Sequence, residues 1–293
     1  MIKAVDLIAK FVQSLQEKWG YIWGKAGDKW TQAKQNNLVQ YMVNKYGANW
    51  KTSAAAKKDG RYGSACVGAK WINHIVADCS GLFSYWFAKL GGFMYHGSDT
   101  MFKKYTTANG TLVNGKRSDG QELKPGTAVF VYKSAKNNYS HVGLYIGNNE
   151  VIEAASSEKG VIKSKASDKK WTHWGELKGV EYSDTPVTKP TLKKGDKGAW
   201  VTLAQTELIN KGYSCGKTGA DGDFGNNTEA AVKRFQNDYG LKVDGIIGQD
   251  TWNALDGAEP AIKYTVTVPG LTETQADALI LQYPGSTKKE ERG

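Results

Sequence analysis

The stretch Asp78-Cys-Ser-Gly-Leu82 begins the most strongly patterned segment of the chain. Apolar side chains then recur on one side of a helix that the spacing predicts over Cys79–Leu90, and Gly91-Gly92 ends it. Cys79 therefore lies in the first turn of a helix, where unpaired N–H groups and the positive end of the helix dipole favour a thiolate. The same N–H groups can hold an oxyanion during acyl transfer. This pattern predicts that Cys79 is a nucleophile; an inert buried cysteine is the alternative.

A thiolate nucleophile needs a base, and His141 is the candidate. It begins the segment His141-Val-Gly-Leu-Tyr-Ile-Gly147, which has the pattern of a strand. The imidazole then needs an acceptor that orients the ring and sets its tautomer. The other histidines, His74, His96 and His173, show no metal-ligand spacing, so neither a metal nor a cofactor is expected.

Cys66 and Cys215 are the other two cysteines. Three cysteines do not make a disulfide-stapled scaffold, and an odd number leaves at least one thiol free. We expect Cys66 and Cys215 to be structural or incidental, and we do not expect a Cys66–Cys79 bond because it would remove the nucleophile.

The period of the apolar residues changes after Lys124-Pro-Gly126. Upstream, helical spacing extends over Val5–Trp19 and Trp30–Tyr46, whereas Lys51–Gly68 is rich in Gly, Lys and Ala and is typical of a long loop. Downstream, short β-type runs are separated by Gly and Asn: Thr127–Tyr132, His141–Ile146, Glu150–Ala154 and Gly160–Lys163. Helices followed by an antiparallel meander predict an α+β domain over residues 1–184.

A linker is predicted at residues 185–191, within a stretch that holds two prolines and three threonines. A small helical unit follows over 192–256, in which Asp221-Gly-Asp-Phe-Gly225 recurs as Asp244-Gly-Ile-Ile-Gly248. Each copy supplies a tight turn before a helix, predicted at Glu229–Tyr239 and Trp252–Leu255. Residues 262–293 are predicted to form a strand and a helix of unknown role.

Three blocks of this chain resemble the NlpC/P60 cysteine peptidases in order and spacing: Asp78–Leu82, Leu123–Phe130 and His141–Gly147. The resemblance covers roughly residues 8–182 and implies a papain-like fold. It also implies cleavage of peptidoglycan stem peptides, usually after γ-D-glutamate. Trp19-Gly-Tyr-Ile-Trp-Gly24 resembles the family's upstream Tyr-x-x-Gly element, so Tyr21 is expected in the substrate cleft, with core packing as the alternative; Trp23 is expected in the core.

From the resemblance, Tyr21, Asp78 and Ser80 are the candidate substrate-binding residues. Residues 192–255 resemble the peptidoglycan-binding domain 1 family, a three-helix wall-targeting module. The stretch between Gly24 and Asp78 is longer than the family's usual spacer, so substrate preference does not carry over safely.

The third catalytic position of the family, commonly a second His, is Glu153 here. A carboxylate that accepts from the imidazole N–H is chemically sound. His141 and Glu153 share a sheet face only if the loop between them has an odd number of residues or a bulge, which Gly147-Asn-Asn149 can supply. A solvated hairpin glutamate is the alternative.

Composition narrows the class of protein. The 293 residues are 40% hydrophobic and 23% charged, with a mean hydropathy of −0.52, as in soluble globular proteins. No apolar run approaches the ~20 residues of a membrane span. Asp6 and Lys10 interrupt the first apolar stretch, so an amphipathic helix is expected and not a signal peptide.

The net charge of +10 lies entirely in the first part of the chain. Residues 1–184 hold 26 basic and 15 acidic side chains, whereas the remainder holds 13 and 14. A basic surface attracts anionic polymers, and without a zinc-finger or RNA-binding signature a cell wall is favoured over nucleic acid.

The expected function is a peptidoglycan hydrolase of the phage or prophage endolysin type. It would be made in the cytoplasm and act on the wall. An N-acetylmuramoyl-L-alanine amidase with the same Cys–His machinery is one alternative. A non-enzymatic wall-binding protein is another, which the intact Cys79 and His141 pair disfavours.

Overall fold

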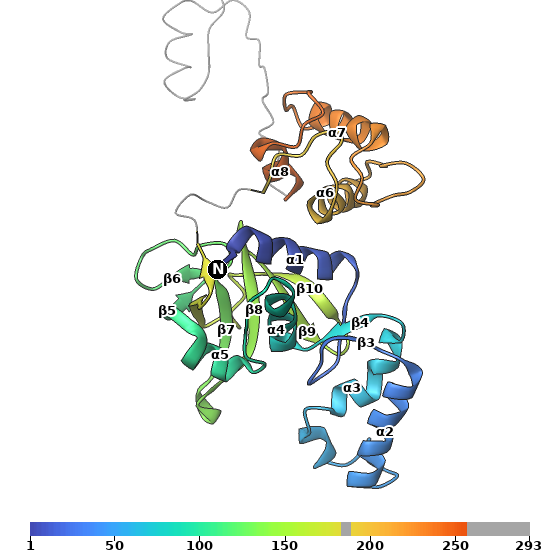
Figure 1. The fold of residues 1–293 in the computed structure, drawn as a ribbon, viewed down its shortest axis with the longest axis vertical. Helices are drawn as coiled ribbons and strands as arrows, with labels where there is room; N and C mark the ends of the chain where they lie inside the picture. Colours follow the sequence, from blue (N-terminus) through green and yellow to red (C-terminus); the bar gives the residue numbers. More distant parts are fainter. Residues whose placement is uncertain (183–188, 257–293) are drawn as a thin grey trace, which may run out of the picture.

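A seven-stranded antiparallel sheet forms the centre of the protein (Figure 1). The structure is a computed structural model that describes residues 1–182 and 189–256. The strand order is β10-β9-β8-β7-β11-β5-β6. The strands are β5 (Thr106–Val113), β6 (Lys116–Arg117), β7 (Ala128–Lys133), β8 (Asn138–Gly147), β9 (Glu150–Ser156), β10 (Gly160–Lys165) and β11 (His173–Leu177).

The predicted α+β class and the meander from β7 to β10 are confirmed. Strands β5 and β11 were not predicted. In β5 only Leu112 is buried, so the strand has no apolar alternation for a sequence pattern to detect. It forms because it pairs with β11, far away in the chain.

Three helices pack around this sheet: α1 (Ala4–Gln16), α4 (Cys79–Lys89) and α5 (Ser98–Tyr105). The first two lie where the spacing predicts them. α4 packs on β8 and β9, and Phe83 of α4 meets Phe11 of α1 edge to face at 4.7 Å. Strand β1 (Ile2–Lys3) pairs in parallel with β12 (Val180–Glu181) beside α1. The helix that carries Cys79 thus packs against the hairpin of β8 and β9.

A second lobe holds α2 (Gln32–Tyr46) and α3 (Tyr62–Val67), at the opposite end of the molecule from α6–α8 (Figure 1). A small sheet of β2 (Gly20–Tyr21), β4 (Ile75–Ala77) and β3 (Ala26–Lys29) connects it to α4. We refer to residues 25–77 as the insertion lobe.

Two predictions fail in and beside the insertion lobe. Lys51–Gly68 is not a long loop, because it contains α3 and a 3₁₀ turn at Ala56–Lys58, and a second 3₁₀ turn follows at Gly68–Trp71. Tertiary packing makes these turns, since Tyr62 lies edge to face on Trp50 at 5.6 Å. Trp23 is not a core residue, because 43% of its surface is exposed.

The C-terminal helices are α6 (Ala199–Asn210), α7 (Asn226–Asp238) and α8 (Gln249–Leu255). The internal repeat has a structural counterpart in two buried glutamines. The Gln205 amide binds Asp221 Oδ1 at 2.9 Å and accepts from Gly222 N–H at 2.8 Å. Gln236 does the same with Asp244 and Gly245, at 3.0 and 2.9 Å. Each glutamine therefore closes one Asp-Gly turn.

This helical unit packs on the preceding α+β domain, with α6 against α1. Lys163 of β10 bridges Glu150 at 2.8 Å and Glu207 of α6 at 3.1 Å. The buried Lys189 ammonium pairs with Asp256. The contacts join α6 and α8 to the strands that carry the candidate site.

Some predictions lie outside the described residues. They are linker positions 185–188 and the strand and helix of 262–293. Within residues 1–182 and 189–256, no helix is both long and apolar enough to cross a membrane.

The β8–β9 hairpin combines a two-residue turn with a bulge. Asn148 and Asn149 have positive φ angles of 47° and 60°, and Gly147 has 98°. Leu144 pairs with Ile152, but the register shifts before Gly147. Because the bulge adds one residue, positions 141 and 153 fall on the same face of the sheet. The bulge expected from the sequence is therefore present.

Asn148→Val should destabilise the protein by about 1–2 kcal/mol relative to Asn148→Gly, because a β-branched residue resists positive φ. Both variants lose the hydrogen bond from Asn148 to Asp256, so their difference isolates the backbone strain. Urea denaturation of the two proteins measures it. Equal stabilities would mean that the turn does not require the left-handed conformation.

Candidate active site

Cys79 lies at the start of α4, directly after the residue that caps the helix. Asp78 Oδ1 accepts from the N–H groups of Ser80 at 3.1 Å and Gly81 at 2.7 Å. Gly81 is needed for close approach, because a Cβ there would lie 2.0 Å from the Lys25 carbonyl oxygen. The Asp-Cys-Ser-Gly sequence thus sets the position of the thiol through the cap and the close contact behind it.

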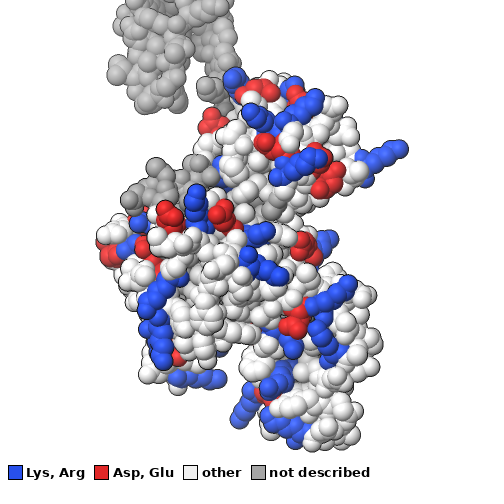
Figure 2. Space-filling view, in the orientation of Figure 1, with Lys and Arg blue, Asp and Glu red and all other residues white. Residues whose placement is uncertain are grey.

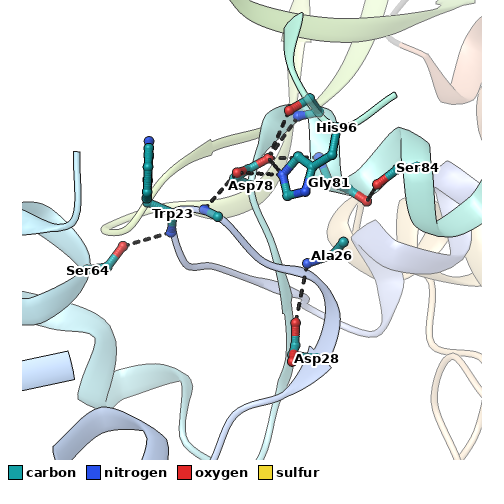
Figure 3. A network of polar contacts seen from close by, with 10 residues as sticks. Trp23, Ala26, Asp28, Ser64, Asp78, Gly81, Ser84 and His96 are labelled. Atoms are coloured by element: carbon teal, nitrogen blue, oxygen red, sulfur yellow. Dashed lines mark hydrogen bonds and ion pairs between the residues drawn. The ribbon is translucent and has the colours of Figure 1, made fainter. Parts of the chain in front are cut away.

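Asp78 also joins three separate segments of the chain (Figure 3). Its Oδ2 accepts from Gly24 N–H at 2.7 Å, and His96 Nε2 lies 2.9 and 2.8 Å from its two oxygens. The hydrogen bond to Asp78 raises the pKa of His96. Burial alone would raise the pKa of Asp78, but hydrogen bonds from His96, Gly81 and Gly24 lower it. Asp78 and Ser80 therefore form the helix cap, and their direct contact with substrate stays a prediction.

His141 and Glu153 meet as the sequence predicts. His141 Nε2 lies 2.6 Å from Glu153 Oε2, and the Glu153 side chain is only 1% exposed. The Cys79 side chain is near enough to the imidazole to raise its pKa. Because Nε2 faces Glu153, Nδ1 is the ring nitrogen available to the thiol. The structure thus brings together the three predicted catalytic residues.

Two further residues complete the surroundings of His141. Lys170 Nζ forms an ion pair with Glu153 Oε1 and lies 4.6 Å from the centre of the Trp171 ring. The Trp171 ring stacks on the imidazole, with 5.6 Å between centroids and 17° between planes. Gly143 leaves room for this ring, because a Cβ there would lie 2.9 Å from it. The buried carboxylate is therefore shared between an imidazole and an ammonium group.

The charges of the site shift the pKa values of His141 and Glu153. Burial alone would lower the pKa of His141, but hydrogen bonds to Cys79 and Glu153 and their negative charges outweigh burial and raise it to about 9. Burial alone would raise the pKa of Glu153, but hydrogen bonds from His141 and Lys170 lower it to about 2. At neutral pH the site therefore holds an imidazolium beside a carboxylate.

Tyr21 of β2 is half-buried and lines a cavity of about 340 Å³ together with Gly63 and Ala155. Burial first, and then the negative charges of Cys79 and Asp78, raise the pKa of Tyr21. The phenol therefore stays protonated and can donate a hydrogen bond. Its place in the substrate cleft and its contact with substrate stay predictions.

Sequence reasoning missed His96, Lys170 and Trp171. His96 lies in a loop and Lys170-Trp171 in a stretch without periodicity, so no local signal marks any of them. His173 instead packs edge to face on Tyr139 at 5.1 Å, and His74 Nδ1 lies 3.1 Å from a backbone carbonyl. Over the described parts of the chain the three cysteines are free, and no cluster of three or more His, Cys, Asp or Glu side chains could hold a metal ion.

A cysteine at a helix start, packed against an antiparallel sheet that supplies histidine, defines a papain-like α+β protein. Comparison with known families agrees with this class. Residues 61–177 match the NlpC/P60 family, and residues 197–255 match the putative peptidoglycan binding domain. The chain therefore carries an NlpC/P60 domain followed by a peptidoglycan-binding domain.

Three curated relatives are similar to parts of the chain. A probable N-acetylmuramoyl-L-alanine amidase of Bacillus licheniformis is 47% identical over 68 residues, which are 23% of this chain and 19% of the relative. The γ-DL-glutamyl hydrolase of Bacillus subtilis is 30% identical over 92 residues, 31% and 20% of the two chains. The probable endopeptidase NlpC of Escherichia coli is 40% identical over 57 residues, 20% and 36%. The chain thus spans well under half the length of each of these relatives.

Lys170→Met should shift the loss of kcat/KM at alkaline pH, which we call the alkaline limb of the pH profile, to a value roughly one pH unit higher. Without the ammonium group, the whole charge of Glu153 stabilises the imidazolium, so His141 keeps its proton to a pH above about 9. Lys170→Arg, which retains the charge, should leave the limb in place. The pH profile on a soluble wall fragment measures this; an unchanged limb in Lys170→Met would show that Lys170 does not act on the pair.

Proposed function

We propose that the chain is a peptidoglycan hydrolase that cleaves stem peptides at the γ-D-glutamyl–diamino acid bond with a Cys79 thiolate. The observation that carries the proposal is the arrangement of Cys79 at the start of α4 with His141 of β8 and Glu153 of β9. Both family matches and the names of the relatives support a cell-wall hydrolase. The peptidoglycan-binding domain supports attachment to the wall as the way the enzyme meets its substrate.

In the proposed mechanism the thiolate of Cys79 attacks the carbonyl carbon of the scissile amide. Backbone N–H groups in the first turn of α4 stabilise the oxyanion that forms. The His141 imidazolium then gives its proton to the leaving amine, and a thioester remains on Cys79. A water molecule, deprotonated by His141, attacks the thioester and releases the acid. Glu153 holds the ring orientation through both steps and stabilises its charged form.

An amidase that cuts between the glycan and the stem peptide is the second candidate. The similarity to the amidase of Bacillus licheniformis favours it. The same thiolate, base and oxyanion donors serve either amide bond, because the chemistry at the carbonyl carbon is identical. The two activities differ only in which amide bond the cleft presents to Cys79.

Digestion of purified sacculi should separate these activities. An endopeptidase leaves a new amino terminus on the diamino acid, whereas an amidase releases whole stem peptides, and mass spectrometry tells the products apart. Wild type should give the first pattern, and Cys79→Ala should give no products while still binding sacculi. If Cys79→Ala hydrolyses as wild type does, the thiolate mechanism is wrong. If wild type binds walls but never cleaves them, the chain is a binding protein.

Glu153→Gln should lose far less activity than Glu153→Ala, because an amide oxygen still accepts the imidazole N–H. Glu153→Ala should lower kcat on the order of 100-fold. In Glu153→Gln the alkaline limb should fall below that of wild type, since the charge that raises the pKa of His141 is gone. Steady-state rates across pH, with melting curves as the folding control, measure both. Near wild-type turnover in Glu153→Ala would remove this residue from the mechanism.

A further inference from the structure

A second cavity, of about 410 Å³, lies where the β2–β3 loop meets the insertion lobe. Its size falls in the range of small-ligand pockets. Its charged lining residues are Lys25, Lys34 and Arg61, all of them cationic. Aromatic faces come from Trp23 and Tyr41, which are 43% and 36% exposed. On the face drawn in Figure 2, Lys and Arg side chains predominate over acidic ones on this lobe.

The Arg61 guanidinium lies over two aromatic rings. Its Cζ lies 4.8 Å from the Trp23 ring centre and 4.7 Å from that of Tyr41. Nη1 reaches the Tyr41 hydroxyl at 3.5 Å and Asp59 at 3.4 Å, whereas Nε and Nη2 bond to none of the described residues. The guanidinium therefore keeps a pair of N–H donors free of partners within the described chain, and such a pair suits a carboxylate.

The nearby acids do not line this cavity. Asp59 is already shared, because it pairs with Lys45 at 3.0 Å and accepts from the Tyr46 hydroxyl at 2.9 Å. Asp28 contacts Lys34 at 3.4 Å. The cavity wall therefore keeps a surplus of positive charge, and a concave wall of one sign concentrates anions.

The same wall adjoins the candidate active site. Gly24 and Lys25 line the cavity and both bond directly to Asp78: Gly24 N–H donates to its carboxylate, and the Lys25 carbonyl accepts its N–H, each at 2.7 Å. Asp78 precedes Cys79 in the chain. Figure 3 shows Trp23 and Asp78 in one network of contacts. The β2–β3 loop therefore forms part of the cavity wall and also contacts the residue next to Cys79 in the chain.

From these contacts we infer that the cavity binds a free carboxylate of the wall peptide, paired with Arg61 and packed against Trp23 and Tyr41. This inference rests on the proposed function, because it names a substrate group that this site recognises. The insertion lobe then contributes to specificity by selecting peptides that carry a free acid at the right distance from the scissile bond.

Calorimetric titration of the full chain carrying Cys79→Ala, which cannot turn the ligand over, tests the inference. The two probes are a soluble stem tetrapeptide with free carboxylates and the same peptide with every carboxylate converted to an amide. The free acid should bind about tenfold or more tightly than the amide. Adding Arg61→Met should abolish that preference, and Arg61→Lys should reduce it, because a lysine keeps the charge but not the fork.

Lys58→Met is the matched control, since Lys58 is an exposed cation of the same lobe outside the cavity. It should keep the full preference. If Arg61→Met fails to fold, Arg61→Lys decides the result. Equal affinity for acid and amide, or a preference that survives loss of Arg61, would overturn the inference.

Two further arms separate the explanations. In the first, glycerol phosphate competes with the free-acid peptide. If it displaces that peptide, and if binding depends on Arg61 but is equal for the acid and the amide, the cavity recognises a wall phosphate and not the peptide. Wild-type cleavage of the tetrapeptide is assayed in parallel. If the enzyme cleaves the peptide but shows no preference for the free acid in binding, the inference about the cavity is wrong and the proposed function stands. If binding depends on Arg61 but no wall substrate is cleaved, the proposed function is wrong.

Discussion

The Asp78 carboxylate is the interaction on which the rest of the site depends. It caps the helix that carries Cys79, accepts from Gly24 in the β2–β3 loop and pairs with His96 from the loop after α4. One buried side chain thereby connects three segments far apart in the sequence. Its acceptor positions are filled from within the protein, so the start of α4 is rigid before substrate arrives. A preorganised helix terminus is what an oxyanion site requires.

Charge balance around Glu153 provides the second constraint. A buried carboxylate is costly unless it is paired, and Glu153 is paired twice, with His141 and with Lys170. The two cations compete for one anion, so Lys170 limits how strongly the imidazolium is stabilised. Strand β9, which holds Glu153, begins with Glu150, and the partner of Glu150, Lys163, contacts α6. Helix α6 therefore contacts β10, and β9 lies between β10 and the strand that carries His141.

Much of the fold could be predicted because many of its elements have a periodic pattern of apolar residues in the local sequence. Helices α1, α2 and α4 and the meander β7 to β10 each have a clear apolar pattern, and the chain forms them where the pattern lies. Strand β5 and helix α3 have none. They exist because β11 supplies the hydrogen bonds of β5 and because Trp50 supplies the packing surface for Tyr62. Long-range partners of this kind leave no trace in a short window of sequence.

The same division holds for the site. The sequence by itself predicted Cys79 as nucleophile and His141 as base, because Asp78–Leu82 and His141–Gly147 form recognisable motifs, and it predicted Glu153 as the third residue from its position in the chain. Only the tertiary structure decided that Lys170 shares Glu153, that His96 pairs with Asp78 and that Trp23 faces solvent beside Arg61. The reason is physical: electrostatic and stacking partners are selected by distance in space, and loops of no regular pattern bring these side chains together.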